Sequence, residues 1–382
     1  MIKKIIIVIL ILFTFTAGFA VNAQVGCGYD FMREFVTKFP DRVAGSENER
    51  EAADYIKEYY ISAGLNPYYD DYIVSFNADD LTSHNVIGFK DSPSDKVIII
   101  GAHYDAVAEG AGVYDNGSGI GAMAEIIARV EDSELTVDLV FIAFGAEEAG
   151  LYGSADFVNN MSAEEINNTL LMINLDSISC GDYLYLYTGE VTGNLANYIL
   201  DIADNSGIML KKAPYGKDII ARPNEYNGHN YDRLLFQSDH APFMGAGIDV
   251  AFFVGYNLEG LYPEESESLP GVMHTEDDNL TDIIELYTEE KVRVRITSVA
   301  SIVTALVSDA DISGIIASGD NKFDYKWMMN EKGIKGVMVG VKAIVLGIMF
   351  IIYLKYYNKV RHLKPEIKAK SDEEYVFDDL KI

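Results

Sequence analysis

The sequence contains little cysteine and little positive charge. Its 382 residues include only two cysteines, Cys27 and Cys180, too few for a disulfide-rich scaffold or a four-thiolate zinc site. Whether these two cysteines pair with each other stays open. Lysine and arginine together number 30 against 59 acidic residues, which gives a formal net charge of −29. Because binding to a phosphate backbone requires neutralising cations, we exclude nucleic acid as a partner.

Low-complexity tracts and internal repeats are also missing from the body of the chain, residues 28–311. Hydrophobic residues make up 49% of the sequence, so the chain can bury a large core and disorder is excluded as its main state. Apolar runs alternate with helical patterns, which is the element order of an α/β protein. We therefore expect residues 28–311 to form one three-layer α/β domain, with a mostly parallel or mixed central sheet flanked by helices.

The first residues, 1–23, have the pattern of a secretory signal peptide. Lys3 and Lys4 precede an apolar run that closes on the small-residue stretch Val21–Ala23. The apolar run is also long enough to remain as an uncleaved membrane anchor, which is the alternative interpretation. We expect cleavage, and therefore place the body of the chain outside the cytoplasm.

A second apolar stretch near the other end predicts a transmembrane helix over residues 333–356. Lysines and an arginine lie at its end and in the short tail 357–382, as the positive-inside rule expects of a cytoplasmic flank. Lys342 interrupts the stretch, so an amphipathic or buried helix is the alternative. We expect a single C-terminal anchor that holds the domain at the extracellular face of the membrane.

Within the domain, short apolar runs predict buried strands, and helical spacing of apolar residues predicts helices. The strands are expected at Val97–Gly101, Val137–Phe144, Leu170–Leu175, Tyr183–Tyr187 and Asp249–Val254, and the helices at Glu47–Gly64, Ile120–Val130 and about Asp282–Ser308. Sheets of this class carry their sites in loops after the carboxyl ends of the strands. The polar residues in those loops are therefore the candidates for chemistry.

Three of the expected strands end in polar residues that suit metal chemistry. His103 and Asp105 follow the first strand, Glu147 and Glu148 the second, and Asp176 the third. His103 and Asp105 are two apart on an extended chain and point the same way. Asp105 can therefore accept the ring N–H that a metal-bound His103 does not use. A hydrogen-bonded core histidine is the alternative interpretation of His103 alone.

Glu147 and Glu148 are adjacent carboxylates, which repel each other unless a positive charge is near. Neighbouring residues point to opposite faces, so one glutamate can ligate a metal while the other takes a proton from a bound water. Two solvated glutamates at the start of a loop are the alternative. Asp176 follows a wholly apolar run and is hard to explain as a surface residue.

Asp115 and His274 complete the candidate set. Asp115 stands at the head of a helix after a glycine-rich approach, where it can cap the helix or bridge two cations. His274 precedes the closing helical run, which the following threonine and acids can cap. Two histidines and three carboxylates give each of two zinc ions one imidazole and one carboxylate of its own, with the last carboxylate shared.

These residues lie in motifs that resemble a known family. The motifs are Gly101–Asp105, Tyr114–Gly119, Phe144–Ser154, Asn174–Asp176, Ser238–His240 and Met273–Thr275, with Phe39–Ser46 upstream. Over roughly Phe31–Ser308 the sequence is similar to the aminopeptidase Y family of co-catalytic zinc exopeptidases, which includes bacterial leucyl aminopeptidases and glutamate carboxypeptidase. The resemblance implies that residues 28–311 are a zinc exopeptidase catalytic domain acting on peptides.

The resemblance also implies a role for each candidate residue. Each of two zinc ions would have one histidine and one carboxylate of its own: His103 and Asp176 for one, His274 and Glu148 for the other, with Asp115 bridging them. Glu147 would be the general base that deprotonates the bridging water and then hands the proton to the leaving amine. Asp105 would act beside His103 as a further catalytic residue.

One position departs from part of that family. Some members have a tyrosine just before the last histidine that helps to stabilise the oxyanion, whereas this chain has Met273 there. The oxyanion donor is therefore unassigned. Tyr226, Tyr231 and Tyr256 are candidates, and spacing favours none of them.

Several functions compete on the sequence alone. The complete ligand set favours a dinuclear aminopeptidase over a mono-zinc glutaminyl cyclase and over a non-catalytic binding ectodomain. A carboxypeptidase is less favoured, because an acidic protein suits a substrate ammonium better than a substrate carboxylate. Side-chain preference and oligomeric state stay open.

Overall fold

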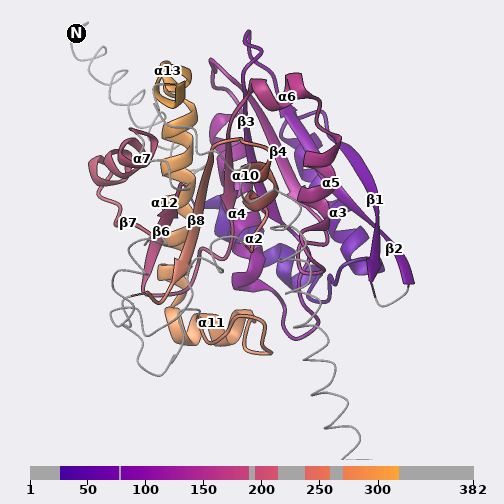
Figure 1. The fold of residues 1–382 in the computed structure, drawn as a ribbon. Helices are drawn as coiled ribbons and strands as arrows, with labels where there is room; N and C mark the ends of the chain where they lie inside the picture. Colours follow the sequence, from indigo (N-terminus) through magenta and orange to yellow (C-terminus); the bar gives the residue numbers. More distant parts are fainter. Residues whose placement is uncertain (1–25, 77–78, 189–193, 214–236, 259–269, 318–382) are drawn as a thin grey trace, which may run out of the picture. The chain divides into compact units, whose positions relative to one another are not determined.

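The computed structural model describes residues 26–76, 79–188, 194–213, 237–258 and 270–317 (Figure 1). These residues belong to one compact unit, Met1–Asp324. The predicted signal peptide (1–23), transmembrane helix (333–356) and tail (357–382) lie outside the described residues, as do Tyr226 and Tyr231. Among the described residues, no helix has both the length and the apolar character needed to cross a bilayer.

An eight-stranded mixed sheet in the order β1-β2-β4-β3-β5-β8-β6-β7 forms the centre of the domain. Its strands are β1 (Tyr68–Phe76), β2 (Asp79–Lys90), β3 (Val97–His103), β4 (Asp138–Phe144), β5 (Thr169–Leu175), β6 (Tyr183–Tyr187), β7 (Leu210–Lys212) and β8 (Val250–Tyr256). The central strands β4, β3, β5 and β8 run parallel, whereas β2 and β6 pair antiparallel with their inner neighbours. The predicted α/β class is confirmed.

The central strands are hydrophobic on both faces, because helices cover both sides of a parallel sheet. All residues of β3 after Val97 and all residues of β4 after Asp138 are buried. The register pairs His103 of β3 with Phe144 of β4, and Gly101 of β3 with Asn174 of β5. The carboxyl ends of these three strands therefore lie side by side at one edge of the sheet.

Helices on one side share a single hydrophobic core with the sheet. They are α2 (Cys27–Lys38), α3 (Glu47–Ser62), α4 (Ser118–Val130) and α12 (Glu289–Val307). α3 begins where the Ser46 side chain accepts the Glu49 amide, and it ends before Gly64, whose φ of +75° suits glycine. The predicted helix at Glu47–Gly64 is confirmed, with a slightly earlier end.

Shorter helices complete the domain. They are α5 (Tyr152–Asn160), α6 (Ala163–Asn168), α7 (Asn194–Asn205), α10 (His240–Gly245), α11 (Leu280–Tyr287) and α13 (Ile312–Ala317). Three of them, α7, α11 and α13, add side chains to the same core as α4 and α12. Phe243 of α10 lies 6.1 Å, between ring centroids, from Phe144 of β4, and 5.9 Å from Phe157 of α5. α5 and α10 therefore pack together over the face opposite α4.

Two features differ from the expectations. The run expected as one helix over about Asp282–Ser308 forms two helices, α11 and α12, because Thr288 between them has a φ of +66° and caps α12 by accepting the Lys291 amide. The hairpin of β1 and β2 was not anticipated; it adds an antiparallel pair at one side of the parallel strands. Cys27 and Cys180 are both thiols, so no disulfide joins them.

Candidate metal site

Three neighbouring strand ends carry the polar residues that the sequence singled out. His103 ends β3, Glu147 and Glu148 follow β4, and Asp176 follows β5. His103 is 1%, Glu147 9% and Asp176 8% exposed. Because β3 pairs with both β4 and β5, the histidine lies between the two sets of carboxylates. The carboxyl edge of the sheet thus holds a buried group of titratable side chains.

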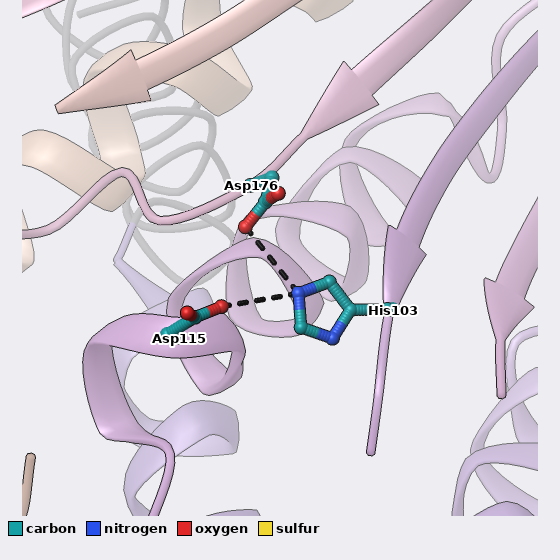
Figure 2. Close-up of side chains that lie close together, drawn as sticks. All are labelled: His103, Asp115 and Asp176. Carbon is teal, nitrogen blue, oxygen red and sulfur yellow. Dashed lines mark ion pairs between the residues drawn. The ribbon is translucent and has the colours of Figure 1, made fainter. Parts of the chain in front are cut away.

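Asp115 reaches the same place from another element. It lies in η1 (Val113–Gly117), a kinked turn with non-helical backbone angles at Asp115 and Asn116 that leads into α4. Gly112 before this turn has a φ of +55°, and a Cβ there would lie 2.6 Å from the Arg42 guanidinium, so the turn requires glycine. A cis peptide bond joins Asp115 to Asn116. Figure 2 shows that Asp115 and Asp176 point at the same ring nitrogen of His103 from two sides.

Asp115 lies between two imidazole rings. Its Oδ1 is 3.1 Å from Nε2 of His103, and its Oδ2 is 3.0 Å from Nε2 of His274. Oδ1 of Asp176 is 3.4 Å from the same His103 nitrogen (Figure 2). Oε2 of Glu148 is 3.3 Å from Nε2 of His274. Each histidine therefore faces one oxygen of Asp115 and one carboxylate of its own.

These side chains form groups that could hold metal ions. One group is His103, Asp115 and Asp176, another is Asp115, Glu148 and His274, and within each the ligand atoms lie within 4.8 Å of one another. Imidazole nitrogens and carboxylate oxygens are donors that zinc accepts. Oε1 of Glu148 is buried and has no hydrogen-bond partner among the described residues. A buried carboxylate oxygen needs a partner, so this donor set fits a cation.

Asp105 joins the histidine to the glutamates. Its Oδ1 lies 3.5 Å from Nδ1 of His103, and its carbonyl oxygen lies 3.3 Å from the same nitrogen. Its two carboxylate oxygens accept the backbone amides of Glu147 and Glu148 at 3.0 and 3.1 Å. The sequence pointed to the contact with the histidine but not to the contacts with the glutamate backbone. Asp105 therefore fixes the chain that carries both glutamates.

Burial and mutual repulsion perturb the carboxylates. Burial raises the pKa of Glu147 well above its usual range, and Glu148 and Asp239 raise it further against the opposing effect of His103. Burial, followed by the charge of Asp115, raises the pKa of Glu148 to about 7. Such shifts mark a group of like charges that a cation would relieve.

The pKa values of both histidines are raised as well, but by the neighbouring carboxylates and against the effect of burial. Hydrogen bonds to Asp115 and Glu148 raise the pKa of His274 to about 11. Burial alone would lower the pKa of His103, but the neighbouring carboxylates Glu147 and Asp176 raise it well above its usual range. The carboxylates around both imidazoles therefore favour a positive charge at this place, as they would favour a bound metal ion.

Some supporting residues were missed in the sequence. Asp278 was interpreted with its neighbours as a helix cap, but it accepts the amides of Val113, Tyr114 and Asp115 at 2.9, 2.7 and 3.1 Å. Asn279 caps α11 instead. The only sequence signal for Asp278 is an acidic residue close behind His274, which cannot be told from a cap without the fold.

Two further residues lie beside the ligand group. Ser238 donates a hydrogen bond of 2.6 Å to Oδ2 of Asp176. Tyr256, one of the oxyanion candidates, ends β8 and is buried; burial raises its pKa well above the usual range, and so do the charges of Asp176, Asp115 and Glu147. Tyr256 therefore lies within the electrostatic influence of these carboxylates.

Comparison with known sequences agrees with this geometry. The model of peptidase family M28 matches residues 85–296. Aminopeptidase YwaD of Bacillus subtilis (strain 168) is 30% identical over 234 residues, which are 60% of this chain and 45% of that protein. The alkaline phosphatase isozyme conversion protein of Escherichia coli (strain K12) is 31% identical over 210 residues, 48% of this chain and 61% of that protein. The chain thus spans about half the length of these curated relatives.

Solved structures share the fold. BSAP, a zinc aminopeptidase from Bacillus subtilis, matches with a TM-score of 0.59 and 18% identity over 74% of this chain and 96% of that chain. The glutaminyl cyclase of Bacteroides thetaiotaomicron matches with a TM-score of 0.58 and 18% identity over 74% of this chain and 97% of that chain. Because both enzymes share the fold to the same degree, the fold alone does not distinguish their reactions.

Proposed function

This chain belongs to peptidase family M28, and from that premise we propose that it is a dinuclear-zinc aminopeptidase that removes N-terminal residues from peptides. The printed name of its Bacillus relative, an aminopeptidase, supports the type of reaction. The site supports a metallopeptidase because it gathers imidazoles and carboxylates at the strand ends where such sheets bind their ligands.

The position of Asp115 carries the proposal of two ions. Its two oxygens face two different histidines, and each histidine has a second carboxylate within 3.4 Å, Asp176 for His103 and Glu148 for His274. A single ion would bind one of these two ligand sets and leave the other set without a metal ion. We therefore assign one ion to His103, Asp115 and Asp176, and the other to Asp115, Glu148 and His274.

Zinc bound at these residues would supply Lewis acidity and lower the pKa of water, so that hydroxide is available near neutral pH. Glu147 belongs to neither assigned set, yet its carboxylate lies within 4.8 Å of ligand atoms of His103 and Glu148. We propose that Glu147 accepts the proton of the attacking water and passes it to the leaving amine. Asp105 positions this base through the Glu147 amide.

The test combines metal analysis with hydrolysis. We expect about two zinc ions per chain, the stoichiometry of a co-catalytic site, and cleavage of amino-acid p-nitroanilides that stops on chelation and returns with zinc. Glu147→Gln should keep its metal and lose at least about 100-fold in kcat, as expected for loss of a general base. One zinc together with cyclisation of N-terminal glutamine would instead identify a glutaminyl cyclase.

The cell compartment is a separate part of the proposal. The predicted signal peptide (1–23) and the predicted membrane helix (333–356) place the domain at the extracellular face of the membrane. Protease added to intact cells should then degrade the domain and leave only the membrane helix and the short tail protected. Protection of the whole chain would contradict this placement.

A further inference from the structure

The segment Arg42–Glu49 runs from the loop after α2 into the first turn of α3, and it contacts the backbone around both sets of candidate ligands. Arg42 at one end meets residues 104–112, the loop between His103 and Asp115. Glu49 at the other end accepts the amide of Ala146, the residue just before Glu147. The segment itself holds none of the candidate ligands.

Arg42 is a buried cation whose side-chain hydrogen bonds in the described part of the chain all go to carbonyl oxygens. It is 0% exposed. Its Nε donates to the carbonyl of Tyr104, and Nη1 and Nη2 donate to the carbonyls of Ala111 and Gly112 at 2.6 and 2.7 Å. Its own carbonyl accepts the Ala106 amide at 3.1 Å. The Arg42 side chain therefore joins the two ends of the 104–112 loop. In this way it fixes the relative positions of His103 and Asp115, which flank the loop.

Glu49 is a buried carboxylate in the first turn of α3. It is 1% exposed. Its Oε2 accepts the Gly45 amide at 2.6 Å, while its Oε1 accepts the Ser83 hydroxyl at 2.7 Å and the Ala146 amide at 3.1 Å. Ala146 has a φ of +50°, a conformation that needs support from its surroundings. A helix-capping glutamate thus also holds the backbone that turns into the glutamate pair.

Two further contacts complete this arrangement. Tyr72 of β1 donates to the Gly145 carbonyl at 2.7 Å and lies 3.2 Å from the Ser83 hydroxyl. From the other side, Asp105 ties the chain next to Tyr104 to the amides of Glu147 and Glu148. These contacts connect Arg42 to the 104–112 loop, that loop to Glu147 and Glu148, and the backbone before Glu147 to Glu49, which lies on the same segment as Arg42.

We propose that Arg42 and Glu49 are positioning residues that set the spacing between the histidine-bearing loop and the glutamate pair. They act through backbone amides and carbonyls, and so align Glu147 and Glu148 with His103 without touching the substrate. The kinetic consequence rests on the proposed aminopeptidase function. The structural consequence, a fixed backbone at residues 145–148, does not.

The chain provides a matched control in Glu125 of α4. Glu125 is also a buried glutamate, 0% exposed, and it also accepts amides at the start of a helix, Gly26 and Gly28 at 3.0 and 3.1 Å. It additionally pairs with Arg129 at 2.6 Å. Its contacts lie among α2, α4 and α12. Glu125→Gln therefore measures the loss of a buried capping carboxylate away from the ligand loops.

The experiment compares Glu49→Gln, Arg42→Lys and Tyr72→Phe with Glu125→Gln in the full chain. Hydrogen exchange of the metal-free protein reports the backbone at residues 145–148. The visible spectrum of the Co²⁺-substituted protein reports ligand geometry, and leucine p-nitroanilide gives kcat and KM. For Glu49→Gln we expect faster exchange at residues 145–148, an altered Co²⁺ spectrum and kcat lowered about 10–100-fold with KM little changed. Arg42→Lys should alter the same spectrum.

Each outcome decides a specific point. The proposal is overturned if Glu49→Gln and Tyr72→Phe both keep the exchange rates, the Co²⁺ spectrum and the kcat of the wild type. It is also overturned if Glu125→Gln changes these quantities as much as Glu49→Gln does, because the effect would then be one of general stability. If Glu49→Gln does not fold, Tyr72→Phe tests the same turn by a milder change. If the wild type cleaves no anilide, the proposed function fails, while the exchange and Co²⁺ measurements still decide the positioning role.

Discussion

The two halves of the candidate metal site are built from different kinds of structure. His103 and Asp176 lie at the ends of neighbouring parallel strands, with side chains 1% and 11% exposed. His274 lies in the loop before α11, with a side chain 51% exposed and a backbone φ of +57°. The sheet therefore fixes the first half, whereas the second half depends on how the loop is held.

The two proposed ions should therefore bind with different affinities. A ligand set that is rigid and buried before binding loses little freedom when the ion arrives, whereas a loop must be ordered. Asp278 does part of that ordering, because it ties the His274 loop to η1, which carries Asp115. We expect the ion at His103 and Asp176 to bind more tightly than the ion at His274 and Glu148.

The largest expected effect comes from removing either histidine. His103→Ala and His274→Ala should each lower kcat/KM by about 1,000-fold or more, because several kcal/mol of metal-ion stabilisation are lost. Metal content after dialysis separates them. His274→Ala should retain one tightly held zinc, and His103→Ala should retain less. The reverse order of retention would contradict the comparison of the two halves.

A smaller effect is expected at Asp278, which supports the loop without being a ligand. Asp278→Asn replaces one acceptor oxygen by a donor facing backbone amides, so the second ion should bind about 10–100-fold more weakly. The first ion shares Asp115 with the second, so its affinity should fall by less. Zinc titration of the metal-free protein, followed by competition with a coloured chelator, measures both affinities. Asp277→Asn is the matched control, because the neighbouring Asp277 is exposed. Equal weakening of both ions would show that Asp278 does not act on one half alone.

The comparison also explains what the sequence revealed. Strand ends can be predicted from a single sequence. An apolar run followed by a polar residue identifies His103 and Asp176 and the edge of the sheet that they share. The contacts made by Asp278, Glu49 and Arg42 cannot be predicted from the sequence in this way. They join segments far apart in the chain, as in the 2.7 Å hydrogen bond from the Tyr114 amide to Asp278. In addition, the sequence around a capping residue does not show which backbone amides the residue accepts. The split at Thr288 was missed because helical periodicity continues on both sides of it.

The smallest predicted effect is a pH dependence of stability in the metal-free protein. Burial raises the folded-state pKa of Asp278 to about 7, with hydrogen bonds from the Tyr114 and Asp115 amides opposing the shift. Burial, followed by the charge of Asp105, raises the pKa of Glu49 to about 8. Acids with raised pKa values bind protons more tightly when folded. Their contribution to stability is therefore full below about pH 4, the ordinary range of carboxyl groups, and is lost as the pH rises through 7 and 8.

The two histidines change stability in the same direction, because their pKa values are also raised on folding. Asp115 has a lowered pKa and acts in the opposite direction, but only in acid below this window. The melting temperature of the metal-free protein should therefore fall between pH 6 and pH 9, by roughly 2–4 °C for each kcal/mol lost. Asp278→Asn should reduce that slope and Asp277→Asn should not. A melting temperature that rises over this range would contradict the raised pKa values of these buried acids.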